Sequence, residues 1–149
     1  TYNLETGVGD FNFRLLATYL KHREFISDIG EEAYAFEPTV GEIEYPRWKA
    51  RFTAGYTYED FFVQLTANYR HSVVEDREWT VEVNDYNEVS SHIKWDLFAR
   101  YHVTDNLEVR GGVNNLFDKT PPRNPFAYKD GEYYDVYGRT LTFGVNYTF

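Results

Sequence analysis

The sequence has no cysteine among its 149 residues, and this absence excludes a disulfide framework, thiolate zinc sites and cysteine nucleophiles. Long apolar runs are also missing, because no window approaches the ~20 consecutive apolar residues of a membrane-spanning helix. Basic residues are in the minority: 15 Lys and Arg stand against 24 Asp and Glu, for a net charge of -9. This charge disfavours binding to a phosphate backbone, so we expect no nucleic-acid partner.

Aromatic residues, by contrast, are abundant, and they alternate with polar ones. The chain holds 14 Tyr, 12 Phe and 3 Trp, yet its mean hydropathy is -0.61. Near the carboxyl end, odd positions from Leu141 to Phe149 are apolar or aromatic, whereas even positions from Thr140 to Thr148 are small and polar. A period of two predicts a strand with one apolar and one polar face. The same alternation predicts strands at about residues 11–20, 48–58, 61–70, 93–102, 107–114 and 141–149, with the tail of a further strand at 1–5.

The connections between these predicted strands alternate between short and long. This sorting is typical of bacterial outer-membrane barrels, in which the long loops face outward. Charged residues on the polar face, such as Arg51 and Asp96, would be buried at high cost in a small soluble barrel, but they stay hydrated in a wide lumen. We therefore predict an all-β fold, an antiparallel transmembrane β-barrel segment of about six to seven strands; a soluble β-barrel that binds a ligand is the alternative. The expected turns are residues 7–10, 59–60 and 104–106, and the expected long loops are 27–45, 75–88 and 118–134.

The same parity assigns side chains to the two faces of the sheet. Aromatic residues near the strand ends fall on the apolar face, where interfacial girdles of a barrel lie. An arginine introduced on the apolar face is expected to destabilise the barrel more than one introduced at Thr66 on the polar face. Near the middle of the membrane we expect Phe52, Leu65, Leu97 and Phe143 to face lipid, and Arg51, Thr66, Asp96 and Thr142 to face the lumen.

Two stretches near the carboxyl end carry a family resemblance. Residues 112–122 read Gly-Val-Asn-Asn-Leu-Phe-Asp-Lys-Thr-Pro-Pro, and residues 134–139 read Tyr-Asp-Val-Tyr-Gly-Arg. Together with the terminal strand, they resemble the end of the β-barrel of TonB-dependent outer-membrane receptors. The resemblance implies that a Gly-Arg pair opens the last strand, and that a terminal Phe is part of the signal read by the barrel assembly machinery. The implied assembly residues are Gly138, Arg139, Gly144, Tyr147 and Phe149.

The resemblance also sets expectations for domain organisation. Receptors of this family have a 22-stranded barrel behind an N-terminal plug domain, and even the smallest single-chain barrels need about eight strands. We therefore expect residues 1–149 to be the C-terminal portion of the barrel, with the plug and the N-terminal strands absent; residues 1–5 show no signal peptide. The implied partners are the remaining barrel and plug segment of the same receptor, the TonB complex through the missing N-terminal part, the barrel assembly machinery, lipid and lipopolysaccharide, and a small-molecule substrate.

The function implied by the resemblance is uptake of a scarce solute, such as a siderophore, a vitamin or an oligosaccharide, with energy delivered through TonB. A stand-alone small outer-membrane barrel with a structural or adhesive role is the alternative. An enzyme is not expected, because no catalytic motif is present. We expect no metal and no cofactor, because the histidines lack the paired spacing of a metal site. These histidines are His22, His71, His92 and His102.

The long loops combine aromatic and acidic residues. Convergent aromatic side chains are typical anchors for ligands, and carboxylates at the rim favour cationic ligands over anionic ones. Alternatively, the aromatic residues only pack the loops against one another and the acids only solvate them. The candidate ligand contacts are Trp79, Tyr86, Tyr128, Tyr133 and Tyr134, and the rim acids are Glu31, Glu32, Glu42, Glu44 and Asp85.

Overall fold

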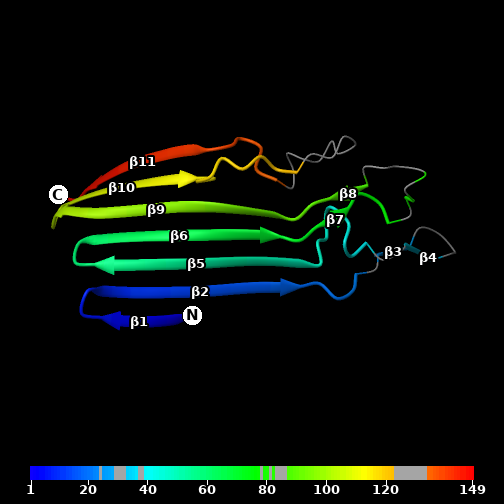
Figure 1. Cartoon of the computed structure of the whole chain (residues 1–149), viewed down its shortest axis with the longest axis horizontal. Coiled ribbons are helices and arrows are strands. Elements are labelled where there is room, and N and C mark those ends of the chain that lie inside the picture. The colour runs from blue at the N-terminus through cyan, green and yellow to red at the C-terminus, as the bar shows by residue number, and fades with distance from the viewer. Residues whose placement is uncertain are drawn as a thin grey trace.

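A computed structural model of the chain describes residues 1–23, 25–28, 33–36, 39–77, 79–80, 82, 87–122 and 134–149. Within these residues, seven strands form one antiparallel sheet in the order β1-β2-β5-β6-β9-β10-β11 (Figure 1). Each strand pairs with the next long strand of the chain, so the sheet is an up-and-down meander. No helix in the described part of the chain is long and apolar enough to cross a membrane.

The strands of the main sheet correspond to the strands that the alternation predicts. The prediction of six full strands and the tail of another is therefore confirmed. The bounds are β1 Tyr2–Thr6, β2 Gly9–Tyr19, β5 Trp48–Tyr58, β6 Phe61–Arg70, β9 His92–Thr104, β10 Leu107–Asn114 and β11 Thr140–Tyr147.

The register places the apolar residues of neighbouring strands directly opposite one another. Leu15 pairs with Phe52, and Phe52 pairs with Ala67 on its other side. Residues that pair across antiparallel strands share a face of the sheet, so one face is apolar from edge to edge. The predicted grouping of side chains onto two faces is confirmed, because Leu65 lies opposite Leu97 whereas Thr66 lies opposite Asp96. That the apolar face meets lipid stays a prediction.

The polar face departs from simple parity at Leu16 and at an aromatic pair on adjacent strands. Phe62 and Phe98 lie on the polar face, with their ring centroids 6.3 Å apart. The guanidinium of Arg100 lies 5.0 Å from the centroid of the Phe62 ring. Gly55 makes room for this pair, because a side chain at Gly55 would meet the Phe62 ring at 3.3 Å. An apolar island therefore interrupts the charged lining near the short-turn end of the sheet.

The short turns and the long connections lie at opposite ends of the sheet (Figure 1). Gly9 adopts a φ of 123°, and a Cβ there would lie 2.6 Å from the Tyr56 ring, so the first turn requires glycine. The hydroxyl of Tyr56 also donates to the backbone carbonyl of Val8 at 2.5 Å. At the second turn, Glu59 takes a left-handed φ of 50°. The predicted alternation of short and long connections is confirmed.

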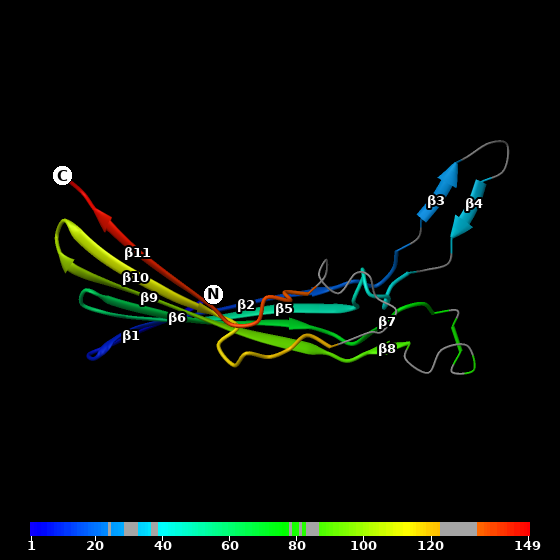
Figure 2. The same cartoon turned by 90° about the horizontal axis from the view of Figure 1, so that it is seen from above.

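Two of the long connections contain additional strands, so the prediction of plain loops is wrong there. The first holds the hairpin of β3 Phe25–Asp28 and β4 Ala33–Phe36, and the short strands β7 Val73–Val74 and β8 Glu88–Val89 pair with each other. Figure 2 shows that the β3–β4 hairpin projects beyond the end of the main sheet. Runs of two to four residues are too short for periodicity to identify.

The sheet is open in the described part of the chain, because β1 and β11 lie at opposite edges and do not pair (Figures 1 and 2). Its apolar face is also uncovered: Leu15 is 66% exposed and Phe143 is 79% exposed. The only buried cluster of apolar residues among those described is at the long-loop end, and it consists of Ile43, Val73, Val89 and Tyr134. A large apolar surface of this kind marks a contact with lipid or with another protein surface.

Candidate functional site: the polar wall and its loop base

Basic residues gather on the polar face of β2, β5 and β6, towards the long-loop end. Arg14 lies opposite Thr53, and Arg51 lies opposite Leu16 on one side and Asn68 on the other. One row further towards the loops, Lys49 lies opposite Arg70. Like charges directly opposite each other repel, so this part of the wall carries a positive potential. We call the four side chains Arg14, Lys49, Arg51 and Arg70 the basic wall.

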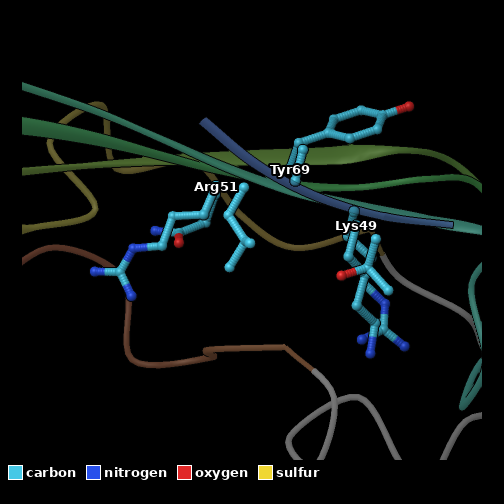
Figure 3. Close-up of a pocket in the computed structure, with 8 residues that line it drawn as sticks. Lys49, Arg51 and Tyr69 are labelled. Carbon is cyan, nitrogen blue, oxygen red and sulfur yellow. The ribbon is translucent and has the colours of Figure 1, made fainter. Parts of the chain in front are cut away.

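Three clefts open on this wall, and Arg51 lines all of them. Their volumes are about 280, 410 and 370 Å³. Arg14 and Gln64 line the second cleft, and Lys94 and Asp135 line the third. Figure 3 shows the first cleft, where Lys49 and Arg51 extend to one side of the sheet and Tyr69 extends to the other. The charged side chains therefore point away from the apolar face.

Asp96 of β9 connects the wall to the loop that follows β10. Its carboxylate accepts a hydrogen bond from the Asn68 side chain at 2.9 Å and another from the backbone N–H of Asn115 at 2.9 Å. The Lys94 ammonium lies 3.7 Å from the same carboxylate. Asn115 is only 1% exposed, and its side-chain amide bonds both the N–H and the carbonyl of Lys119. The Asn-Asn pair of the family-like motif therefore builds a fixed turn on the wall.

The same turn holds the start of the last strand. The carboxylate of Asp118 accepts a hydrogen bond from the backbone N–H of Arg139 at 2.8 Å. Asn115 and Asp118 take left-handed φ values of 56° and 52°, which these two residue types tolerate better than most. Gly138 also has a positive φ, 69°, and a side chain there would approach Asp118 Oδ1 to 3.1 Å. The Gly138-Arg139 pair precedes β11 directly, and this contact fixes its position.

Replacing Asp118 by Ala is expected to loosen the base of the β10–β11 loop. The change removes the acceptor for the Arg139 N–H, and alanine disfavours the left-handed backbone by about 1 kcal/mol or more. The rate of limited proteolysis near residue 118 in the folded receptor should rise several-fold. Asp118→Asn is the matched control, since asparagine keeps an acceptor oxygen and tolerates the same φ. Equal cleavage of the Ala and Asn variants would contradict the role of this contact.

An ion pair between Asp135, a few residues before β11, and Lys94 connects this part of the chain to the wall. The Asp135 carboxylate accepts hydrogen bonds from the Lys94 ammonium at 3.0 Å and from the Asn114 side chain at 2.9 Å. These bonds, first the one from Lys94, hold the pKa of Asp135 below its usual range. Lys94 also donates to Asn114 Oδ1 at 2.9 Å. The charge of Lys94 is therefore balanced by its neighbours.

Tyr134 is a predicted ligand contact, and the structure gives it a packing role. Its ring is 6% exposed and belongs to the apolar cluster with Ile43 and Val89. The His92 ring meets it edge-on at 5.7 Å, and the Arg70 guanidinium lies 5.0 Å from its centroid. Little of the ring is left for a solute, so Tyr134 anchors the loop in this structure. Its contact with a ligand stays a prediction.

The other predicted contacts are less defined by the structure. Trp79 is half-buried, and its backbone bonds Asp76 and Asn87 within the second long loop. It lies on a different connection from Tyr134. Three of the predicted contacts lie outside the described residues: Tyr86, Tyr128 and Tyr133. Of the rim acids, only Glu42 and Glu44 are described, and burial raises the pKa of Glu42.

The terminal strand carries the remaining predicted residues. Gly144 lets the Arg110 side chain cross β11, because a Cβ at position 144 would lie 2.9 Å from Arg110 Nε. Tyr147 is 55% exposed on the apolar face, and its ring meets that of Phe149 edge-on at 5.1 Å. Phe149 is fully exposed. These positions form one accessible aromatic end, and their part in assembly stays a prediction.

No group of three or more metal-binding side chains occurs among the residues that the structure describes. His102 contacts Glu108 at 3.2 Å near the short-turn end, whereas His92 lies at the other end of β9. His71 contacts the Tyr69 hydroxyl at 2.9 Å. Among the described histidines, His71 and His92 therefore lie near the long-loop end of the sheet and His102 lies near its short-turn end.

Comparisons with known proteins identify the family to which this two-faced sheet belongs. The family described as "TonB dependent receptor-like, beta-barrel" matches residues 1–116. The chain belongs to this family, and its sheet is part of the barrel wall. The vitamin B12 transporter BtuB of Photobacterium profundum is 32% identical over 100 residues, which are 67% of this chain and 14% of that protein.

Two solved structures share the fold. The siderophore receptor PiuA from Acinetobacter baumannii matches with a TM-score of 0.61 and 21% identity, over 97% of this chain and 20% of that one. The ferric enterobactin receptor PfeA from Pseudomonas aeruginosa, a G324V mutant, matches with a TM-score of 0.55 and 16% identity, over 99% of this chain and 21% of that one. The chain thus spans between about a seventh and a fifth of the length of these proteins.

Proposed function

We propose that this chain is the C-terminal part of the barrel wall, with its outward loops, of an outer-membrane receptor that imports a scarce solute with TonB-derived energy. Membership of the receptor family over residues 1–116 is the observation that carries the proposal. The two-faced sheet supports it, because a wall with apolar residues outside and charged residues inside suits a water-filled barrel in lipid. The plug and the contact with TonB belong to the rest of the receptor.

The short turns are assigned to the periplasm and the long loops to the outside of the cell. On this orientation, the basic wall and its three clefts lie in the outer half of the lumen, directly below the loops. A solute that enters from outside meets the loops first and this wall next. The named relatives include a vitamin B12 transporter and siderophore receptors, and these two solute classes, with oligosaccharides, are the substrates to test.

Assembly of β11 is assigned to the barrel assembly machinery. The exposed pair of Tyr147 and Phe149 supports this assignment, because an accessible aromatic end is available for recognition. The outward rings also place apolar and amphipathic surface where lipid and lipopolysaccharide contact a barrel.

The proposal predicts that loss of the full-length receptor abolishes energy-dependent uptake of one solute class. Uptake of labelled ferric siderophores, cyanocobalamin and oligosaccharides should be compared in the parent strain, a receptor deletion and a TonB deletion. We expect uptake of the same solute to fall at least tenfold in both the receptor deletion and the TonB deletion. The receptor itself should fractionate with the outer membrane.

Unchanged uptake of every solute by the receptor deletion would contradict import and favour a structural or adhesive barrel. Uptake that needs the receptor but not TonB would contradict the energy source alone. The alternative of a stand-alone small barrel also predicts no plug upstream in the gene, which its sequence decides directly.

A further inference from the structure

The chain carries a net charge of -9, but its acids and bases are separated in space. On β2, β5 and β6, the polar-face positions from Asn12 towards the long loops contain arginine and lysine but no aspartate or glutamate. Near the long-loop end, the described acids of the wall lie on β9 and on the loop after β10, where Asp96 and Asp135 flank Lys94. Other acids of the polar face, Glu5, Asp10 and Glu108, lie towards the short-turn end. At the long-loop end, the part of the wall formed by β2, β5 and β6 is therefore cationic, whereas Lys94 on β9 is balanced by two acids.

The basic residues of that cationic side differ in how far they are engaged. Arg70 donates a hydrogen bond to the backbone carbonyl of Ile43 and lies over the Tyr134 ring, so it stabilises the base of the loops. Arg14, Lys49 and Arg51 are exposed, and no ion pair with a described acid is found for them. Lys49 moreover faces the guanidinium of Arg70 in the register. An anion bound among these three cations would relieve their mutual repulsion.

Two clefts that share part of their lining are together lined by all three cations. Arg14 lines the cleft of about 410 Å³, Lys49 lines that of about 280 Å³, and Arg51 and Leu16 line both. Guanidinium groups bind carboxylates through two parallel hydrogen bonds, and lysine adds a point charge. Clefts lined by one sign of charge raise the local concentration of the opposite ion by ten- to a thousandfold.

We infer that Arg14, Lys49 and Arg51 form a binding site in the outer half of the lumen for an anionic solute with several carboxylate or comparable anionic oxygens. This inference names the substrate class for the proposed importer and rests on that proposed function. It revises the expectation from the rim acids, which favour cations at the loop surface; below the rim, the described wall carries the opposite sign.

A pair of charged thiol reagents tests the site without knowledge of the natural solute. Leu16 is 57% exposed on the polar face opposite Arg51, so Leu16→Cys places a thiol inside the site. In the full-length receptor, freed of any other cysteine, its labelling rates with 2-sulfonatoethyl and 2-(trimethylammonio)ethyl methanethiosulfonate should be compared. For each position, the labelling rate with the anionic reagent is divided by that with the cationic reagent, and this ratio is normalised to the same ratio for a free thiol in solution. The normalised ratio at position 16 should be about tenfold higher than at a control position.

The control position is Asn146→Cys, which lies on the polar face opposite Glu108, away from the basic wall. Changing Arg14, Lys49 and Arg51 to Gln should lower the ratio at position 16 to the control value. Citrate, used as a tricarboxylate probe, should slow labelling at position 16 more than sodium chloride of equal ionic strength does, and only with the three cations present. Equal effects of citrate and salt would mean general screening and would overturn the site.

Two further outcomes also overturn the inference. Equal rate ratios at positions 16 and 146 would show that no excess positive potential reaches solutes. No labelling by either reagent at position 16 would show that another part of the receptor covers the wall, so that the cations serve a protein contact. Labelling does not require transport, so a receptor can pass this test while failing the uptake test, or the reverse. The two proposals therefore fail separately.

Discussion

Replacing Leu65 by Arg in the full-length receptor will destabilise the protein folded in a bilayer by about 2–4 kcal/mol, whereas Gln64→Arg will destabilise it far less. The two residues are neighbours on β6 at the same depth, but they point to opposite faces of the sheet. Leu65 pairs with Ala54 and Leu97 on the apolar face, and Gln64 lines a cleft on the polar face beside Arg14. An arginine at position 65 must enter lipid or bend away from it, while one at position 64 meets water.

The measurement is a urea titration of the receptor folded into vesicles, with the fraction folded read from intrinsic fluorescence. A difference below about 1 kcal/mol between the two variants would contradict the assignment of faces. Thr66, the control that parity suggests, is unsuitable, because it is 4% exposed beneath its neighbours. An arginine there would have to displace packed side chains, so we expect a larger cost at this position than the mild effect expected from the sequence.

The strands and their faces could be predicted from the sequence because one local rule covers them. Alternation fixes which side chains share a face, and consecutive strands joined by turns as tight as Glu59-Asp60 have almost no freedom in register. Once Tyr58 lies opposite Phe61, every pair of β5 and β6 follows up to Lys49 and Arg70. The pairing of these strands therefore follows from local sequence alone.

The rest depends on contacts between residues that are distant in the sequence. Nothing near Asp118 indicates that its carboxylate will receive the Arg139 N–H, and nothing near Asp96 indicates that it will bond Asn115. Parity also fails to explain Phe62 and Phe98 on the polar face. Their positions make sense only when Gly55, on the neighbouring strand, is seen to leave space for the Phe62 ring.

The cationic character of the wall shows the same limit in a different way. The overall charge of -9 and the acidic loops suggest that cations are the preferred ligands. Arg14, Lys49 and Arg51 are spread over 38 positions of the sequence numbering, and only pairing of β2 with β5 brings them together. Net charge describes the whole chain, whereas a solute experiences the potential of the one surface it meets.

The isolated 149-residue chain is expected not to form a closed, monomeric barrel in detergent or lipid. Within the described residues, β1 pairs only with β2 and β11 pairs only with β10, so each edge strand leaves a row of backbone donors and acceptors without a partner strand. Each such group costs several kcal/mol in the hydrocarbon region, where no water can replace its partner.

Refolding the chain alone should therefore give aggregates or mixed oligomers, whereas the full-length receptor refolded in parallel should give a monodisperse monomer. Heat resistance on an unboiled gel separates the two, because closed outer-membrane barrels stay folded and compact under those conditions. The expectation follows from the open edges alone and does not depend on which solute the receptor imports. A heat-resistant, monodisperse monomer of the 149-residue chain would show that β1 and β11 can pair with each other. It would then favour the stand-alone small barrel over the receptor segment.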